Sequence, residues 1–127
     1  MSYTDLLGCK FKIHGRTKEE GFDCYGLAME VLKRNGIILP EIPYLDFKNR
    51  EEIREDILFN TEYEIIAKPV ENCIIEMEVK GQPLHVAVYI GNGKIIHSTR
   101  NMGVIIEPIR IYQNRIRGCY KVKNSNL

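Results

Sequence analysis

Cys24 is the residue of this chain whose position suggests nucleophilic chemistry. It follows Gly21-Phe22-Asp23 and opens a segment of helical periodicity, so its thiol is expected at a helix N-terminus. Free backbone N–H groups and the positive end of the helix dipole gather there. Both favour the thiolate, which is the nucleophilic form of cysteine. Gly26, two residues later, would let a chain segment or a substrate approach the helix start; the alternative is a buried cysteine that only fills space.

Two histidines could supply a base. His85 begins the strand-like run His85-Val-Ala-Val-Tyr-Ile-Gly91, and His97 lies near the end of the next predicted strand. If Asn92 and Gly93 are the two turn residues of an ideal hairpin, His97 falls on the face opposite to His85. One extra residue in the hairpin would move His97 to the face of His85. The alternative for His85 is a strand-end histidine hydrogen-bonded only to water, and His14 is expected in a loop.

Periodicity predicts the elements that would hold these side chains. Leu27, Ala28, Val31 and Leu32 recur at helical spacing, with Asp23 as a suitable N-cap and Gly36 as a stop, which predicts a helix over residues 24–35. A second helix is predicted over 49–59. Strands are predicted at 63–67, 73–79, 85–90, 94–98, 104–107 and 118–122. The order predicts an α+β domain, with N-terminal helices packed on an antiparallel sheet.

Length and composition fit one domain over residues 1–127. Hydrophobic residues make up 44% and charged residues 28% of the chain, enough for one core without staples. No apolar run approaches the ~20 residues that span a bilayer. Because residues 1–8 lack the basic and apolar regions of a signal peptide, we expect a cytoplasmic protein as synthesised.

Charge and cysteine spacing exclude some classes of site. The net charge of +1 argues against a dedicated nucleic-acid binder. It sums an acidic segment, 41–64, and a basic one, 94–127, which could mark a partner surface or two solvated faces that attract each other. Cys9, Cys24, Cys73 and Cys119 form no close pair, so a structural zinc site has no support. Four free thiols are favoured over two disulfides.

Two motifs together resemble a known family. Gly21-Phe-Asp-Cys-Tyr-Gly-Leu27, followed by His85-Val-Ala-Val-Tyr-Ile-Gly-Asn-Gly-Lys-Ile-Ile-His97, is similar to the NlpC-type (NlpC and p-sixty superfamily) cell-wall cysteine peptidases. Their pattern is Asp-Cys-Ser-Gly-Leu and, much later, His-Val-Gly-Ile-Tyr-Ile-Gly-x-Gly-x-x-x-His. The Asp-Cys-Tyr-Gly-Leu variant, with Gly-Ile-x-Leu-Pro soon after, looks most like the branch found in phage tail-tip proteins and prophages.

The resemblance implies a papain-like fold and a catalytic triad. Cys24 matches the nucleophile, His85 the general base and His97 the residue that orients the base, which implies a hairpin that departs from ideal register, for example through a bulge. The implied reaction hydrolyses an amide of peptidoglycan stem peptides, often between D-γ-glutamate and a diamino acid, through a thioester and without a cofactor or metal. Further substrate contacts are implied at the following residues: Phe11, in place of the family's tyrosine; His14, as its substitute; Asp23; and Tyr25.

Three alternatives to hydrolysis remain open. A phage tail-tip assembly protein could keep the fold with little or no hydrolysis, and would bind other tail proteins in the virion. A thiol acyltransferase acting on a non-wall substrate would use the same residues. A metal site of Cys24, His85 and His97 has suitable ligand types but lacks the usual close spacing.

Overall fold

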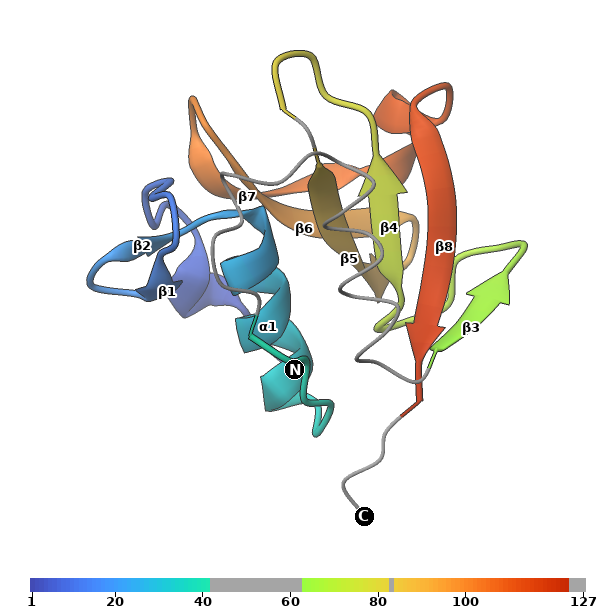
Figure 1. Cartoon of the computed structure of the whole chain (residues 1–127), viewed down its shortest axis with the longest axis horizontal. Helices are drawn as coiled ribbons and strands as arrows, with labels where there is room; N and C mark the ends of the chain where they lie inside the picture. The colour runs from blue at the N-terminus through green and yellow to red at the C-terminus, as the bar shows by residue number, and fades with distance from the viewer. Residues whose placement is uncertain (42–62, 83, 124–127) are drawn as a thin grey trace.

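A six-stranded antiparallel sheet forms the larger part of this computed structural model, which describes residues 1–41, 63–82 and 84–123. The strand order is β3-β8-β4-β5-β6-β7 (Figure 1). The strands are β3 (Tyr63–Ile66), β4 (Ile74–Met77), β5 (His85–Gly91), β6 (Lys94–Thr99), β7 (Gly103–Pro108) and β8 (Ile116–Val122). All six were predicted from the sequence, and each end lies within two residues of its predicted position.

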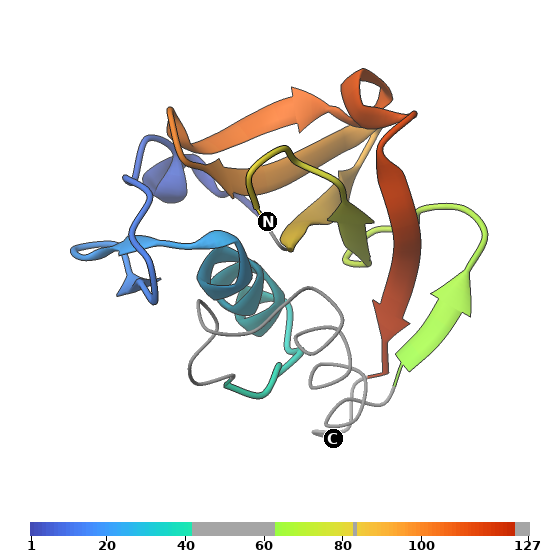
Figure 2. The same cartoon turned by 45° about the horizontal axis from the view of Figure 1, so that its top comes forward.

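The helix α1 (Cys24–Arg34) packs against one face of this sheet, next to β5 and β6 (Figure 2). The predicted helix is confirmed, as is its cap, because the Asp23 side chain accepts a hydrogen bond from the Gly26 amide. Gly36 ends it in the left-handed region at φ +80°, which costs glycine little. Leu27, Val31 and Leu32 are buried against the sheet. Burying such side chains stabilises a fold by roughly 1.5–3 kcal/mol each.

Side chains alternate between two apolar layers along β5. Val86 and Val88 belong to the layer under α1, whereas Ala87 belongs to the opposite layer, with Ile75 and Ile95. Because successive residues of a strand point to opposite faces, His85 shares the face of Ala87. The base predicted from the sequence therefore begins a strand that is buried on both sides.

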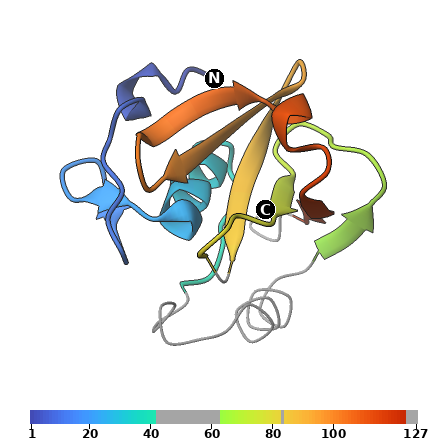
Figure 3. The same ribbon diagram turned by 90° about the horizontal axis from the view of Figure 1, so that it is seen from above.

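A small hairpin of β1 (Arg16–Thr17) and β2 (Gly21–Phe22) precedes the helix and lies beside its start (Figure 3). It was not predicted, because two residues per strand are too few for a visible period of two. Two 3-10 helices, Thr4–Leu6 and Ile109–Tyr112, were also missed, because they are too short to show a helical period. The predicted helix over 49–59 lies outside the described residues. Within those residues, no helix is long and apolar enough to span a bilayer.

Candidate active site

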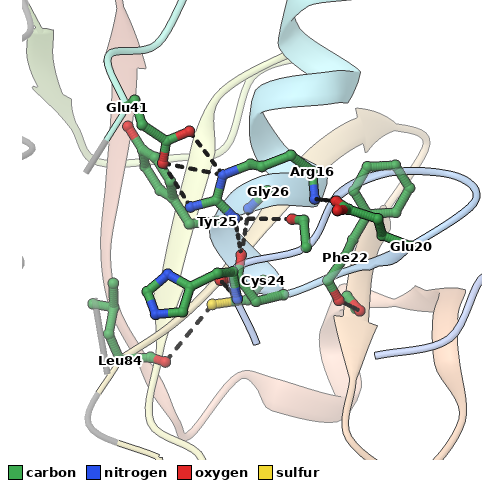
Figure 4. A network of polar contacts seen from close by, with 12 residues as sticks. Arg16, Glu20, Phe22, Cys24, Tyr25, Gly26, Glu41 and Leu84 are labelled. Atoms are coloured by element: carbon green, nitrogen blue, oxygen red, sulfur yellow. Dashed lines mark hydrogen bonds and ion pairs between the residues drawn. The ribbon is translucent and has the colours of Figure 1, made fainter. Parts of the chain in front are cut away.

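Asp23 fixes the start of α1 through both carboxylate oxygens. Its Oδ1 accepts from the Gly26 amide at 2.7 Å and from Arg16 Nη1 at 2.9 Å, and its Oδ2 accepts from the His14 amide at 3.0 Å. Both Nε and Nη2 of Arg16 also donate hydrogen bonds to the Glu41 carboxylate (Figure 4). The carboxylate therefore ties the first helical turn to the loop before it, and the following residue, Cys24, is held in place.

Residue 26 has to be glycine, because the chain before the helix passes very close to it. A Cβ atom on it would lie 2.1 Å from the Gly15 carbonyl oxygen and 2.8 Å from Arg16 Nη1. Real side chains do not approach that closely, so the hairpin strand β1 can pass the helix start only because residue 26 has no side chain. The close approach expected at this glycine is confirmed, and the approaching segment belongs to the chain itself.

Cys24 lies against β5 with its side chain only 6% exposed. Its Sγ donates to the Leu84 carbonyl oxygen at 3.8 Å, as Figure 4 shows. Burial raises the pKa of the thiol to about 12, and the charge of Asp23 adds to this, although backbone N–H groups of Val86, Tyr25 and Cys24 act in the opposite direction. The expectation of a thiolate is therefore wrong for this conformation, because loss of solvent outweighs the helix N-terminus.

His97 lies on the face of His85, because β5 contains one extra residue. Gly91 pairs with Lys94 as in an ideal two-residue hairpin, but Tyr89 pairs with Ile95, so Ile90 is an additional residue without a partner. Continuing the register by one pair puts His97 opposite Ala87, which shares the face of His85. The bulge that the resemblance implied is confirmed, and the ideal register is corrected by one residue.

The two imidazoles form part of a hydrogen-bonded chain. His85 Nε2 lies 2.8 Å from His97 Nδ1, and His97 Nε2 lies 2.7 Å from Glu107 Oε1. The Tyr112 hydroxyl donates to the same carboxylate oxygen at 2.7 Å. Both histidine rings are 1% exposed. The relay thus runs from the start of β5 to β7 and to the 3-10 helix after it, in the order His85, His97, Glu107, Tyr112.

Glu107 and Tyr112 were missed by the sequence analysis. A signal for Glu107 exists, since His97 pairs with Ile105 and residue 107 is its diagonal neighbour on the same face. Finding it requires the register of the β6–β7 hairpin, in which Thr99 pairs with Gly103. Tyr112 has no such signal, because it reaches Glu107 from a 3-10 helix that has no periodicity to read.

Among the described residues, Cys24 contacts the backbone next to His85 in the chain but makes no hydrogen bond to the His85 ring. Of the hydrogen bonds in the described part of the chain, none joins the Cys24 sulfur to the His85 ring; His85 Nδ1 instead faces Gln82 Oε1 at 3.3 Å. Burial, and then the neighbouring His97, lower the pKa of His85 to about 3. Thiol and imidazole are therefore both uncharged in this conformation.

A cavity of about 390 Å³ opens beside the two histidines. Its lining includes His85, His97, Tyr112, Lys80, Arg100 and Arg115. The Arg100 guanidinium stands 5.6 Å from the ring centroid of Phe11, and that of Arg115 stands 5.8 Å from the centroid of Tyr112. Three cations thus surround a cavity that ends at the relay, and two of them lie over aromatic rings.

The residues expected to contact a substrate divide into two groups. Phe11 lies under Arg100, which lines this cavity, and His14 is exposed and in the left-handed region at φ +63°. Asp23 and Tyr25 are buried, and the Tyr25 hydroxyl donates to the Pro40 carbonyl. The structure gives these two residues the role of holding the helix start and the core.

The cysteines and acids offer no further centre. All four cysteines are free thiols. In the described ranges, no three His, Cys, Asp or Glu side chains gather as a metal ion would require.

Comparison with known proteins finds a matching family model and enzymes of similar sequence. The model of the NlpC/P60 family matches residues 8–120. The gamma-DL-glutamyl hydrolase of Bacillus subtilis is 34% identical over 104 residues, which are 80% of this chain and 23% of that protein. The murein DD-endopeptidase MepS/murein LD-carboxypeptidase of Escherichia coli is 25% identical over 84% of this chain and 51% of that protein. The chain thus spans about half or less of the length of these relatives.

A solved structure supports the fold. A Staphylococcus aureus protein, described as similar to a lipoprotein of the NLP/P60 family, superposes with a TM-score of 0.65 at 20% identity. The match covers 94% of this chain and 38% of that one.

Proposed function

Because the chain belongs to the NlpC/P60 family, we propose that it is a cysteine peptidase that hydrolyses amide bonds in the stem peptides of peptidoglycan. One observation carries the proposal. Cys24 is the first residue of α1, and its sulfur contacts the backbone of Leu84 and Val86, the residues before and after His85. His85 in turn makes a hydrogen bond to His97, the next member of the buried relay. A nucleophile, a base and a group that orients the base are the parts that acyl transfer needs.

The reaction would begin with transfer of the Cys24 proton to His85 Nδ1 as the sulfur attacks the carbonyl carbon of the substrate. The amide C–N bond then breaks, the imidazolium of His85 gives its proton to the leaving amine, and a thioester remains on Cys24. Water, deprotonated by the same imidazole, releases the acyl group and restores the thiol. Because thiol and imidazole are neutral here, the substrate has to drive the proton transfer.

The helix start supplies candidate donors for the oxyanion. The backbone N–H groups of Cys24 and Tyr25 act on the Cys24 sulfur, where they lower the pKa of the thiol. A carbonyl carbon attacked by this sulfur brings its oxygen within reach of the same groups. Backbone donors fixed by a helix need no rearrangement when charge develops, which is why such sites stabilise the transition state.

The cavity suggests which bond is cleaved. A glutamate joined through its γ-carboxyl keeps a free α-carboxylate, and Lys80, Arg100 and Arg115 offer cations for it beside the relay. The similarity to a gamma-DL-glutamyl hydrolase supports the same unit. We therefore propose the bond between D-γ-glutamate and a diamino acid as the substrate bond.

Incubation with defined muropeptides tests this function. Wild-type protein is expected to split a peptide containing the D-γ-glutamyl-diamino acid bond into two products that mass spectrometry identifies, and Cys24→Ala is expected to abolish the cleavage. Cys9→Ala, at a cysteine far from the relay in the chain, is the matched control. Hydrolysis that persists in Cys24→Ala would sink the proposal. A product joined to an acceptor other than water would indicate a thiol acyltransferase instead.

A second candidate, a phage tail-tip protein that keeps the fold without hydrolysis, has one observation in its favour. Among the hydrogen bonds of the described residues, none joins the Cys24 sulfur to the His85 ring, so the thiol cannot pass its proton to the imidazole in this conformation. This function predicts that wild-type protein cleaves no muropeptide and that a complex with tail proteins survives Cys24→Ala. Co-purification from cells that express a tail-tip assembly would detect such a complex.

A further inference from the structure

We propose that Glu107 is a positioning residue that fixes the proton of the His85 imidazole on Nε2 and leaves Nδ1 bare. This inference rests on the proposed function in one respect only, the use of that bare nitrogen as the base for Cys24. The relay itself is independent of any substrate. It consists of three contacts of 2.7–2.8 Å between His85, His97, Glu107 and Tyr112.

The direction of the relay follows from its outer end. Two groups converge on Glu107 Oε1, the Tyr112 hydroxyl and His97 Nε2. A carboxylate oxygen can accept both, so Nε2 of His97 carries the hydrogen. Burial alone would raise the pKa of Glu107, but the hydrogen bonds from Tyr112 and His97 outweigh it and the pKa is lowered. Glu107 is therefore the ionised acceptor at which the chain of donors ends.

The proton on His97 Nε2 determines which nitrogen of the His85 ring carries its hydrogen. Burial lowers the pKa of His97 in spite of the opposing pull of Glu107, so the ring is neutral and carries one hydrogen. Its Nδ1 is then a lone pair, and it lies 2.8 Å from His85 Nε2. His85 Nε2 has to donate, which leaves His85 Nδ1 without a hydrogen. This is the nitrogen that a thiol proton requires.

Gln82 makes the opposite arrangement accessible. Its Oε1 faces His85 Nδ1 at 3.3 Å, and an amide oxygen can only accept. Without Glu107, both rings could reverse, so that His97 Nδ1 donates to His85 Nε2 and His85 Nδ1–H donates to Gln82. That tautomer cannot take a proton from Cys24. With Glu107 present, a half-turn of the Gln82 amide brings its NH₂ group to the bare nitrogen and leaves the shape of the side chain unchanged.

Nitrogen-15 NMR of the imidazoles tests the proposal without a substrate. Protonated and bare ring nitrogens have different chemical shifts, and the chain has only three histidines, so a His14→Gln variant simplifies the assignment. Wild-type protein is expected to show a protonated Nε2 on both His85 and His97. Glu107→Ala is expected to move the His85 proton to Nδ1 and to lower kcat roughly 10–100-fold with little change in KM, the size of effect seen when a group that orients a functional histidine is removed.

Glu64→Ala is the matched control, because Glu64 lies on β3, the edge strand opposite to the edge strand β7 that carries Glu107. It is expected to change neither the tautomers nor kcat. A proton on Nδ1 of His85 in the wild type would overturn the proposal even if Glu107→Ala fails to fold, and so would an unchanged His85 tautomer in a folded Glu107→Ala. A wild type that cleaves no muropeptide overturns the proposed function, whereas the NMR result still decides the role of Glu107.

Discussion

The Nε2 atom of His85 lies 2.8 Å from the Nδ1 atom of His97, and a single extra residue in β5 makes this contact possible. Ile90 interrupts the pairing between β5 and β6, which shifts the residues of β6 from Ile95 onward by one position. Without that shift, His97 would point into the apolar layer under α1. The bulge therefore assembles the site, and both imidazoles in it are buried, at 1% exposure each.

Burial of these imidazoles predicts how stability depends on pH. The pKa values of His85 and His97 are lowered in the folded protein, to about 3 for His85, whereas histidines of the unfolded chain titrate near ~6.5. As pH falls through ~6.5, the two histidines bind protons in the unfolded state but stay neutral in the folded state. The free energy of unfolding therefore decreases by up to about 1.4 kcal/mol per pH unit for each histidine. Above that pH, this contribution is constant.

Urea unfolding between about pH 7.5 and pH 5 measures the effect, and it stays above the range where depressed carboxylates add a loss of the same sign. His85→Gln is expected to reduce the slope of stability against pH. His14→Gln, which removes an exposed histidine, serves as the comparison. Equal slopes in wild type and His85→Gln would show that His85 is not kept neutral by folding.

Gly26→Ala is expected to damage both stability and activity. The new methyl group would meet the Gly15 carbonyl at 2.1 Å, so either β1 or the first turn of α1 has to move. Overpacking of this kind costs about 1–3 kcal/mol or more, and the displaced helical turn begins with Cys24. Thermal unfolding and muropeptide turnover would both record the change.

Gly36→Ala separates crowding from backbone strain. Gly36 has φ +80°, and a Cβ atom added to it would meet nothing within 4 Å, so its substitution costs about 1–2 kcal/mol through conformation alone. Its turnover is expected to stay at the wild-type level. Loss of turnover in Gly36→Ala to the same degree as in Gly26→Ala would contradict a specific effect at the helix start.

The sequence predicts α1 and the six-stranded sheet because these elements have clear periods. Apolar residues recur every three to four positions around Leu27 and Val31, and every two along β5. Family resemblance also predicted Cys24, His85 and His97 as the catalytic residues, and the structure brings the two histidines together. The thiolate expectation failed, because spacing reveals a helix N-terminus but not the exposure of the sulfur. The position of Glu107 beside His97 depends on the register of the β6–β7 hairpin, and that of Tyr112 depends on a short 3-10 helix. Neither position follows from the local sequence pattern.

Neutralising a cation of the cavity is expected to weaken substrate binding more than chemistry. Arg100 is exposed at the cavity rim, and the described residues give it no ion-pair partner. Arg100→Gln is expected to raise KM about tenfold for a peptide with a free α-carboxylate, since one such contact is worth roughly 1.4 kcal/mol, and to change kcat little. Steady-state kinetics at low salt would measure both constants.

The same substrate with an α-carboxamide provides the comparison for Arg100. Wild type and Arg100→Gln should then share one KM, because the charge that Arg100 recognises is gone. Lys121→Gln, which removes an exposed cation on β8 outside the cavity lining, should leave KM unchanged for both substrates. If KM rises equally in Lys121→Gln, the effect of Arg100→Gln comes from the overall charge of the protein and not from a contact in the cavity.

Alkylation of the cysteines tests whether Cys24 is activated before substrate arrives. Iodoacetamide reacts with thiolates, and burial raises the pKa of Cys24 to about 12 and that of Cys73 to about 11. Cys9 is only partly buried, so it is expected to be labelled first near neutral pH, as peptide mapping would show. Labelling of Cys24 should keep rising with pH. Preferential labelling of Cys24 at neutral pH would mean that His85 already holds its proton in solution. In contrast, if an electrophile attached to a γ-glutamyl group labels Cys24 much faster than iodoacetamide does in a Cys9→Ser background, the activation comes from substrate binding, as the neutral thiol and imidazole require.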